Sequence, residues 1–162
     1  MPKERYHKFI FDLSNFADDA EEQSHFIEAM VIRFLSLEET LKVYLAGHYR
    51  RKGVKEKTIS KATYEEKSFE KLAMKLELLG SPDYKFIEEL IKANTERNKI
   101  IHKLFRNEFK TLKEIQNRAK LNIKRINKCE EKIALKLCKK RLISENPSLS
   151  RMKAYKRLLR EI

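Results

Sequence analysis

The chain has 162 residues, a length that fits one domain whose core folds without disulfides or metals. Charged residues make up 38% of it, with three glycines and three prolines, a composition typical of helices rather than of hairpin-rich sheets. The formal net charge of +13 and the pI near 9.7 indicate an acidic partner, with nucleic acid favoured over a membrane surface or an acidic protein.

The apolar stretches argue against a membrane or exported protein. The most apolar one, residues 26–37, is interrupted by Glu28 and Arg33 and falls short of the roughly 18 apolar residues of a spanning helix. Residues 9–12 are too few for the core of a signal peptide. We expect a soluble, cytoplasmic protein with no membrane partner.

The cysteines and histidines give no metal site. Cys129 and Cys138 are nine residues apart in a helical stretch, so at about 100° per residue they point to opposite sides of the helix. Neither a disulfide nor a shared metal is expected, which fits a reducing compartment. Without clustered His, Cys or carboxylates at ligand spacing, we expect no metal and no cofactor.

The first half of the chain predicts a short helix and then a long one. Residues 3–16 form the first, and residues 15–19 read as a break in which Asp18 or Asp19 caps the next helix. The long helix ends at Gly53. Its apolar face recurs at three- and four-residue steps: Phe26, Met30, Phe34, Leu37, Leu41, Tyr44, Leu45 and His48.

The middle of the chain predicts a connector and two further helices. Residues 54–62 are polar and lysine-rich with no helical stripe, so we expect a connector before a helix that begins at Thr63 or Ser68 and ends at Gly80. Ser81 is then the expected N-cap of the following helix, with Pro82 at its first position. That helix is expected to run to about residue 105.

The last long helix is expected to have Asn107 as its N-cap and to continue to about residue 143. Residues 144–148 form a break, and residues 149–162 predict a short basic helix that packs on the bundle, on a second subunit or on a membrane surface. The fold class is therefore all-α, with a helical-bundle domain over residues 1–143 and the basic helix over 144–162. The bundle is antiparallel, with about four main helices and short terminal ones.

The charge is divided unevenly along the chain. Residues 97–162 hold 21 Lys and Arg against 6 Asp and Glu, a net of +15, whereas residues 1–96 hold 16 against 18. The basic half begins at Arg97, within the run Glu96 to Leu104.

Arg97 is the misfit of its helix. With Phe86 at 0°, the helical period places Arg97 near 20°, in the middle of the apolar stripe, and Asn98 and His102 together on a flank near 120° and 160°. A guanidinium on a packing face is costly unless it is paired. Three structural explanations remain open: Arg97 snorkels to the edge, it pairs with a carboxylate such as Glu38, or it faces a partner subunit.

The six residues from Arg97 to His102 resemble the Arg-polar-x-x-x-His signature of the HEPN superfamily, small all-α proteins that include ribonuclease toxins and phage-defence or RNA-processing factors. In that family the signature lies near the end of the third main helix, the position it is expected to have here. The resemblance implies a HEPN-like fold and metal-independent endoribonuclease activity, which leaves 2′,3′-cyclic phosphate and 5′-hydroxyl ends. It also implies a homodimer in which two motifs meet in one cleft.

The resemblance implies a role for each motif residue. His102 becomes the general acid or base, Arg97 holds the phosphate and stabilises developing charge, and Asn98 orients groups by hydrogen bonding. A supporting acidic residue on an earlier helix is expected, with Glu38 as the candidate. An antitoxin or other protein is a further candidate partner, although Leu104 stands where some toxins carry a tyrosine that their antitoxin modifies.

The basic second half is the expected RNA-holding surface, by contacts to backbone phosphate. Runs of charge are often only solvated faces, so two alternatives stay open: a non-catalytic bundle that binds nucleic acid or a protein, and a protein that only dimerises. The expected RNA-binding residues are Lys99, Lys103, Arg106, Lys110, Lys113, Arg118, Lys120, Lys124 and Arg125.

Overall fold

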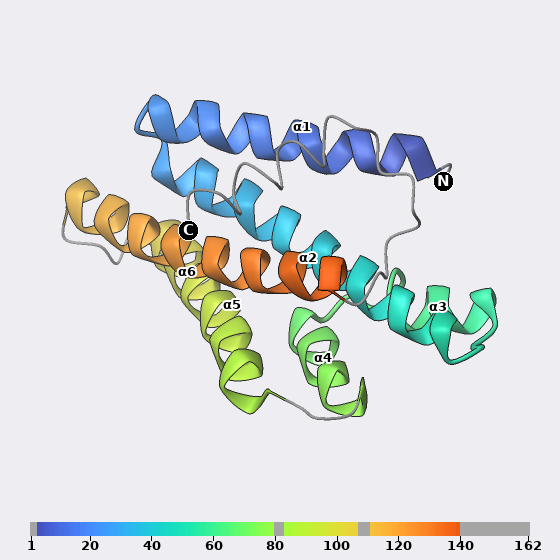
Figure 1. Cartoon of the computed structure of the whole chain (residues 1–162). Helices are drawn as coiled ribbons and strands as arrows, with labels where there is room; N and C mark the ends of the chain where they lie inside the picture. Colours follow the sequence, from blue (N-terminus) through green and yellow to red (C-terminus); the bar gives the residue numbers. More distant parts are fainter. Residues whose placement is uncertain (1–2, 80–82, 107–110, 140–162) are drawn as a thin grey trace.

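A computed structural model describes residues 3–79, 83–106 and 111–139, which form six α-helices and one 3-10 helix and contain no strand. The predicted all-α bundle is confirmed, and its four long helices pack on one another (Figure 1). The elements are α1 (Lys3–Glu22), α2 (Phe26–Arg51), α3 (Glu56–Ala62), α4 (Phe69–Met74), η1 (Lys75–Leu79), α5 (Tyr84–Phe105) and α6 (Leu112–Lys139).

Helix α2 is the centre of the fold. It contacts every other helix of the described chain, with the most extensive contacts to α6 and α1. Its predicted apolar face is confirmed, since Phe34, Leu37, Leu41 and Leu45 are fully buried. Because helices pack on more than one side of α2, burial extends beyond that face to polar residues such as Thr40.

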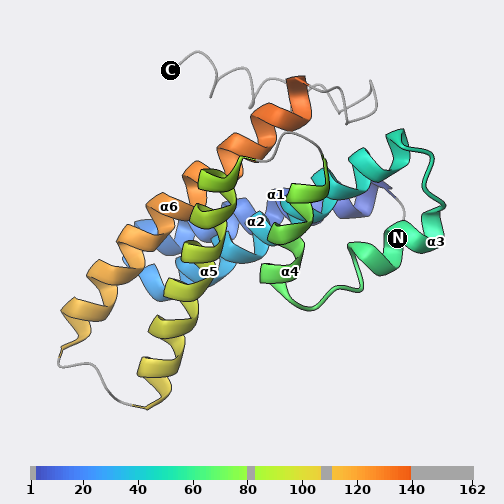
Figure 2. The same ribbon diagram turned by 90° about the horizontal axis from the view of Figure 1, so that it is seen from below.

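Helices α5 and α6 form a second layer beside α2. Figure 2 shows them running side by side in opposite directions, with α4 near the start of α5. Leu90 and Ile100 of α5 and Ile126 and Ile133 of α6 are fully buried and join the α2 residues in one hydrophobic core. The second half of α5 carries the motif: Arg97 packs on Phe34 of α2, and its neighbour Glu96 binds Arg118 of α6.

The predicted break at residues 15–19 is wrong, because α1 continues through it to Glu22. Two features hold this segment in the helix: Ala17 faces the core and is fully buried, and the Asp18 carboxylate binds Arg33 of α2 instead of capping a helix. The chain turns at Ser24, which has a positive φ of 62°.

The predicted connector at residues 54–62 is also wrong in part, because Glu56–Ala62 forms α3. A helix of seven residues is too short to show a stripe, and only Ile59 of it is buried. Its first residue, Glu56, accepts hydrogen bonds at 2.6 and 3.1 Å from the Arg50 guanidinium at the end of α2. The stop of α2 before Gly53 is confirmed, with that glycine at a φ of 73°.

The helix starts agree with the prediction at one position and differ at another. The Ser68 hydroxyl accepts a hydrogen bond from the Lys71 amide at 3.3 Å, as expected of the N-cap of α4. The N-cap of α5 is Asp83 instead of Ser81, and its carboxylate accepts from the Phe86 amide at 3.1 Å. An aspartate is as good a cap as a serine.

Several predictions fall outside the described residues. These are the cap at Asn107, the stop at Gly80, the last turn of the final helix, and the basic helix over 144–162. Among the described residues Cys129 is a free, buried thiol. No helix in the described ranges is long and apolar enough to cross a membrane.

Candidate functional site

The motif arginine projects from the middle of α5 toward α2. Its guanidinium carbon lies 4.2 Å from the centroid of the Phe34 ring, a cation–π contact with the core of the central helix. One terminal nitrogen donates to the Asn94 side-chain oxygen at 3.1 Å. The Nε of Arg97 is buried and has no hydrogen-bond partner within the described part of the chain. The fork is therefore held in place while much of its donor capacity remains unused.

The charge around Arg97 is not neutralised by direct contact. Burial lowers the pKa of the guanidinium, and the negative charge of Glu38 partly opposes this shift. The Glu38 carboxylate itself binds the Lys42 ammonium at 2.8 Å. No carboxylate of residues 3–79, 83–106 or 111–139 forms an ion pair with Arg97. An arginine remains charged in such surroundings, so Arg97 is a partly buried cation that lacks a counterion.

Of the three structural explanations for Arg97, direct pairing with Glu38 is not observed. Glu38 is held by Lys42, which also binds Glu39 at 2.8 Å. The guanidinium of Arg97 instead packs on the Phe34 ring. Glu38 still lies near enough for its charge to act on the guanidinium, so the expected supporting carboxylate is at the edge of the site.

Asn98 and His102 occupy a different flank of α5. Asn98 is half-buried and His102 is exposed. Five residues separate Arg97 from His102, which corresponds to about 7.5 Å along the helix axis and about 140° around it. The two side chains of one chain therefore do not converge on a single point, whereas Asn98 and His102, four residues apart, are neighbours on one flank.

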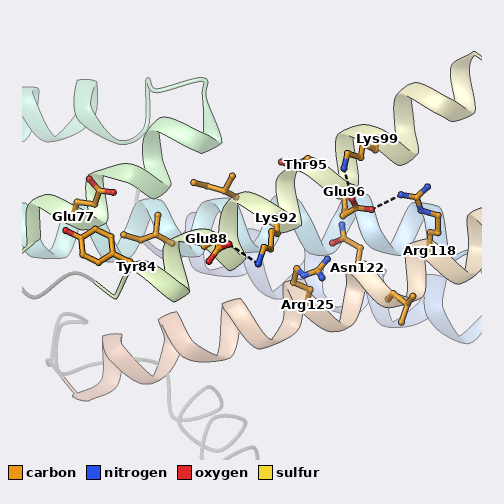
Figure 3. Close-up of a pocket in the computed structure, with 13 residues that line it drawn as sticks. Glu77, Tyr84, Glu88, Lys92, Thr95, Glu96, Lys99, Arg118, Asn122 and Arg125 are labelled. Atoms are coloured by element: carbon orange, nitrogen blue, oxygen red, sulfur yellow. Dashed lines mark hydrogen bonds and ion pairs between the residues drawn. The ribbon is translucent and has the colours of Figure 1, made fainter.

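The groove between α5 and α6 is a separate feature. It has a volume of about 620 Å³ and carries alternating charges along its rim (Figure 3). Figure 3 shows Lys99 and Arg118 reaching the same carboxylate, Glu96, at 3.1 and 2.9 Å. Three expected RNA-binding residues, Lys99, Arg118 and Arg125, line this groove, but Arg97, Asn98 and His102 do not.

The expected RNA-binding residues thus divide by their partners. Arg118 and Arg125 are committed to ion pairs across the α5–α6 contact, and the Lys120 ammonium lies 4.0 Å from the Phe26 ring centroid. Lys113 and Lys124 are exposed. At the end of α5, Lys103 is half-buried and Arg106 is exposed, and Lys110 lies outside the described residues.

Three residues, two at the motif and one in the α5–α6 groove, were not anticipated. Phe34 was expected only as core, yet it is the surface on which Arg97 packs. Asn94 lies one turn before Arg97, and that three-residue spacing was a usable signal for their hydrogen bond. Asn122 of α6 is fully buried and donates to the Ala93 carbonyl at 3.1 Å, while its side-chain oxygen is unpartnered among the described residues.

The described residues contain no group of three or more His, Cys, Asp or Glu that is arranged to hold a metal ion. Chemistry at the motif would fall to the side chains of Arg97, Asn98 and His102 themselves: an anion-binding fork, an amide and an imidazole. Comparisons with protein-family models, curated proteins and solved structures gave no match to this chain.

Proposed function

We propose that this chain is a metal-independent endoribonuclease of the HEPN type, with Arg97 and His102 as its catalytic residues. The observation that carries the proposal is the guanidinium of Arg97, which is partly buried, fixed on Phe34 and without a carboxylate partner among the described residues. A cation in this state is stabilised by a bound anion. A phosphodiester is the anion that matches a planar fork in a strongly basic protein.

In this proposal Arg97 binds the phosphoryl group and stabilises its negative charge. In the cleavage step the ribose 2′-oxygen attacks the adjacent phosphorus, the bond to the 5′-oxygen breaks, and a 2′,3′-cyclic phosphate and a 5′-hydroxyl form. Negative charge grows on the phosphoryl oxygens during this step. Because the guanidinium is already held by Phe34 and Asn94, it binds this charge without reorganising.

In this proposal His102 transfers protons as the general acid or base. An imidazole accepts the proton of the 2′-hydroxyl or donates one to the leaving 5′-oxygen, and it does both near neutral pH. Its exposed position on α5 gives access to a substrate. Asn98, one turn earlier on the same flank, orients the ribose or a phosphoryl oxygen by hydrogen bonding.

The proposed active unit is a homodimer. Arg97 and His102 of one chain diverge by about 140° around α5, so one chain does not offer both groups to one phosphate. Two copies that meet at the ends of their α5 helices bring Arg97 of one copy toward His102 of the other. We propose a toxin, phage-defence or RNA-processing role on cytoplasmic RNA, with an antitoxin or other protein as a further partner.

The test is RNA cleavage in EDTA by the wild type, His102→Ala and Arg97→Ala. We expect both variants to lose at least about 100-fold in rate, since each proposed role contributes on that order, and wild-type products to carry cyclic phosphate ends by mass spectrometry. His25→Ala is the matched control, because His25 is also exposed but lies at the start of α2. Equal cleavage by wild type and both variants, or none by any, would sink the enzyme proposal.

The dimer is tested separately by sedimentation at micromolar concentration. A monomer that cleaves RNA contradicts the composite cleft while leaving Arg97 and His102 as candidates. A second function, non-catalytic binding of nucleic acid, is favoured by exposed lysines on α6 such as Lys113 and Lys124. RNA binding by the wild type without cleavage supports that function instead.

A further inference from the structure

The cations of α6 fall into two rows on different sides of the helix. With the fully buried Ile126 at 0°, the helical period places one row between about 240° and 280°, on the side of α5. The other lies between about 120° and 200°, away from the core. We call them the inner row (Arg118, Arg125, Lys132 and Lys136) and the outer row (Lys113, Lys120, Lys124 and Lys128).

The inner row is part of the fold. Its cations bind carboxylates of α5 and of its N-cap, and these contacts join the two helices along their length. The pairs are Arg118 with Glu96 at 2.9 Å, Arg125 with Glu89 at 3.2 Å, and Lys132 with Asp83 at 2.6 Å. The same contacts lower the pKa of the Glu96 and Asp83 carboxyls. Cations used in this way have little capacity left for an outside anion.

The outer row has no such partners. Lys113, Lys124 and Lys128 are exposed, and none of them forms an ion pair with a carboxylate in the part of the chain that the structure describes. Lys120 lies over the Phe26 ring, a contact that leaves its charge uncompensated. Solvated lysines are common, but four on one ridge beside a fully paired row form a concentrated positive surface.

The length of the outer row, and its position along α6 relative to His102 on α5, suit a nucleic-acid strand. From Lys113 to Lys128 it spans about 22 Å, a length over which its lysines can contact several successive phosphates of one strand. The row also begins at the level of the motif. Counting from the Glu96–Arg118 pair, His102 lies six residues toward the α5–α6 connection on one helix, and Lys113 lies five residues toward it on the other.

We propose that the outer row of α6 holds an RNA strand by its phosphates and leads one end of it to the His102 flank of α5. RNA as the occupant rests on the proposed ribonuclease function, whereas the partition into two rows does not. The contacts are to the backbone and carry no base specificity. The inner row, which includes Arg118 and Arg125, is structural.

The test measures binding without cleavage, in the His102→Ala background, by fluorescence anisotropy with a labelled single-stranded RNA. The triple variant Lys113→Gln, Lys124→Gln, Lys128→Gln removes three positive charges and leaves Lys120 on its aromatic ring. We expect its affinity to fall about tenfold and the slope of log K against log salt to lose about 2, at about 0.7 per lost phosphate contact.

The matched control removes the same charge from exposed lysines of the α3 region: Lys55→Gln, Lys57→Gln, Lys61→Gln. It corrects for the change in net charge, and circular dichroism confirms that both triples are folded. Equal losses in the two triples, or no loss in the α6 triple, overturn the proposal. So does an α6 triple that loses binding to anionic phosphatidylserine vesicles while its RNA affinity is unchanged.

The two proposals fail in different ways. If the α6 triple weakens RNA binding but the wild type cleaves no RNA, the outer row stands and the ribonuclease function falls. If the wild type cleaves RNA and the α6 triple binds it as tightly as the α3 triple does, the ribonuclease stands and the outer row falls.

Discussion

Arg33 of α2 and Arg97 of α5 both pack against neighbouring helices, but their guanidinium groups differ in how many partners they bind. Arg33, with a side chain 13% exposed, binds Asp18, Glu21 at 2.9 Å and the Ser14 hydroxyl at 3.3 Å. Burial lowers the pKa of Arg33, but the hydrogen bonds and charges of Glu21 and Asp18 together outweigh it, so this pKa is raised. Among the described residues, Arg97 has one hydrogen-bond partner, the Asn94 amide, and burial lowers its pKa.

The difference separates a structural cation from a candidate binding cation. A helix pair that needs only to pack has ready ways to compensate a charge, as α1 does for Arg33. Glu38, whose charge acts on Arg97, is instead bound by Lys42 of its own helix, and no carboxylate of the described residues forms an ion pair with Arg97. Residues kept in an unsatisfied state at a cost in stability are characteristic of functional sites.

The largest effect on stability is expected at Arg33, whose guanidinium is bound by two carboxylates and a hydroxyl. Arg33→Met removes the charged hydrogen bonds that join α1 to α2, so we expect the free energy of unfolding to fall by about 2 kcal/mol. Urea denaturation followed by circular dichroism measures it. RNA cleavage below the unfolding transition should be unchanged, and a selective loss of cleavage in this variant would remove the distinction between the two arginines.

The second effect concerns the lysine that holds Glu38. Lys42→Met frees this carboxylate to turn toward Arg97 and occupy the proposed phosphate site, and we expect cleavage to slow about tenfold, or about 1.4 kcal/mol in the barrier. The double variant Lys42→Met, Glu38→Gln should recover most of the rate, because an amide competes weakly for a guanidinium. A double variant as slow as the single one contradicts this role of Lys42.

A smaller effect on stability is expected at Arg97, whose guanidinium is only partly hydrogen-bonded. Arg97→Met deletes a buried donor without a partner and places a thioether against Phe34. The free energy of unfolding should therefore stay within about 0.5 kcal/mol of the wild type or rise, while cleavage is lost. Urea denaturation is again the measurement. A loss of stability as large as that of Arg33→Met would show that Arg97 is a structural residue.

The sequence was sufficient for the elements that depend on local periodicity. The apolar stripe of α2 and its stop before Gly53 were predictable, and so were the course of the motif helix and the position of Arg97 on its packing face. Predictions failed where a distant residue decides local structure. Asp18 looked like a cap because nothing nearby reveals that Arg33, fifteen residues later, binds it.

In the candidate site, too, the features set by local spacing were predictable and those set by helix packing were not. The spacing of Arg97, Asn98 and His102 on α5 came from the helical period, and the Glu38–Lys42 pair has the i,i+4 spacing of neighbours on one helix. The Phe34 platform, in contrast, depends on how α2 docks on α5. The basic half was visible as composition. Its division into a paired and an unpaired row required the α5–α6 register, since Glu96 and Arg118 are 22 residues apart in the chain.

The smallest effect concerns Glu130 of α6. Like Arg97, it is a group whose charged form is disfavoured by burial, but it is an acid, so its pKa is raised. The Ser36 and Thr40 hydroxyls of α2 donate to it at 2.6 and 3.3 Å. Burial raises its pKa, with a further contribution from the charge of Glu131, against the opposing effects of these hydroxyls and of Arg33. The folded protein therefore prefers the protonated carboxyl more strongly than the unfolded chain does.

A raised pKa in the folded state gives stability that is complete below the unfolded pKa and is lost as pH rises through the folded pKa. Glu130→Gln cannot titrate, so the wild type should lose stability relative to this variant as pH increases across that window. Carboxyls whose pKa is lowered, such as Asp83 and Glu96, lose stability toward acid in both proteins, and their effect cancels in the difference. Urea denaturation of the wild type and Glu130→Gln from pH about 4 to about 8 measures the difference in their free energies of unfolding. A difference that is constant over this range would show that burial does not disfavour the ionised form of Glu130.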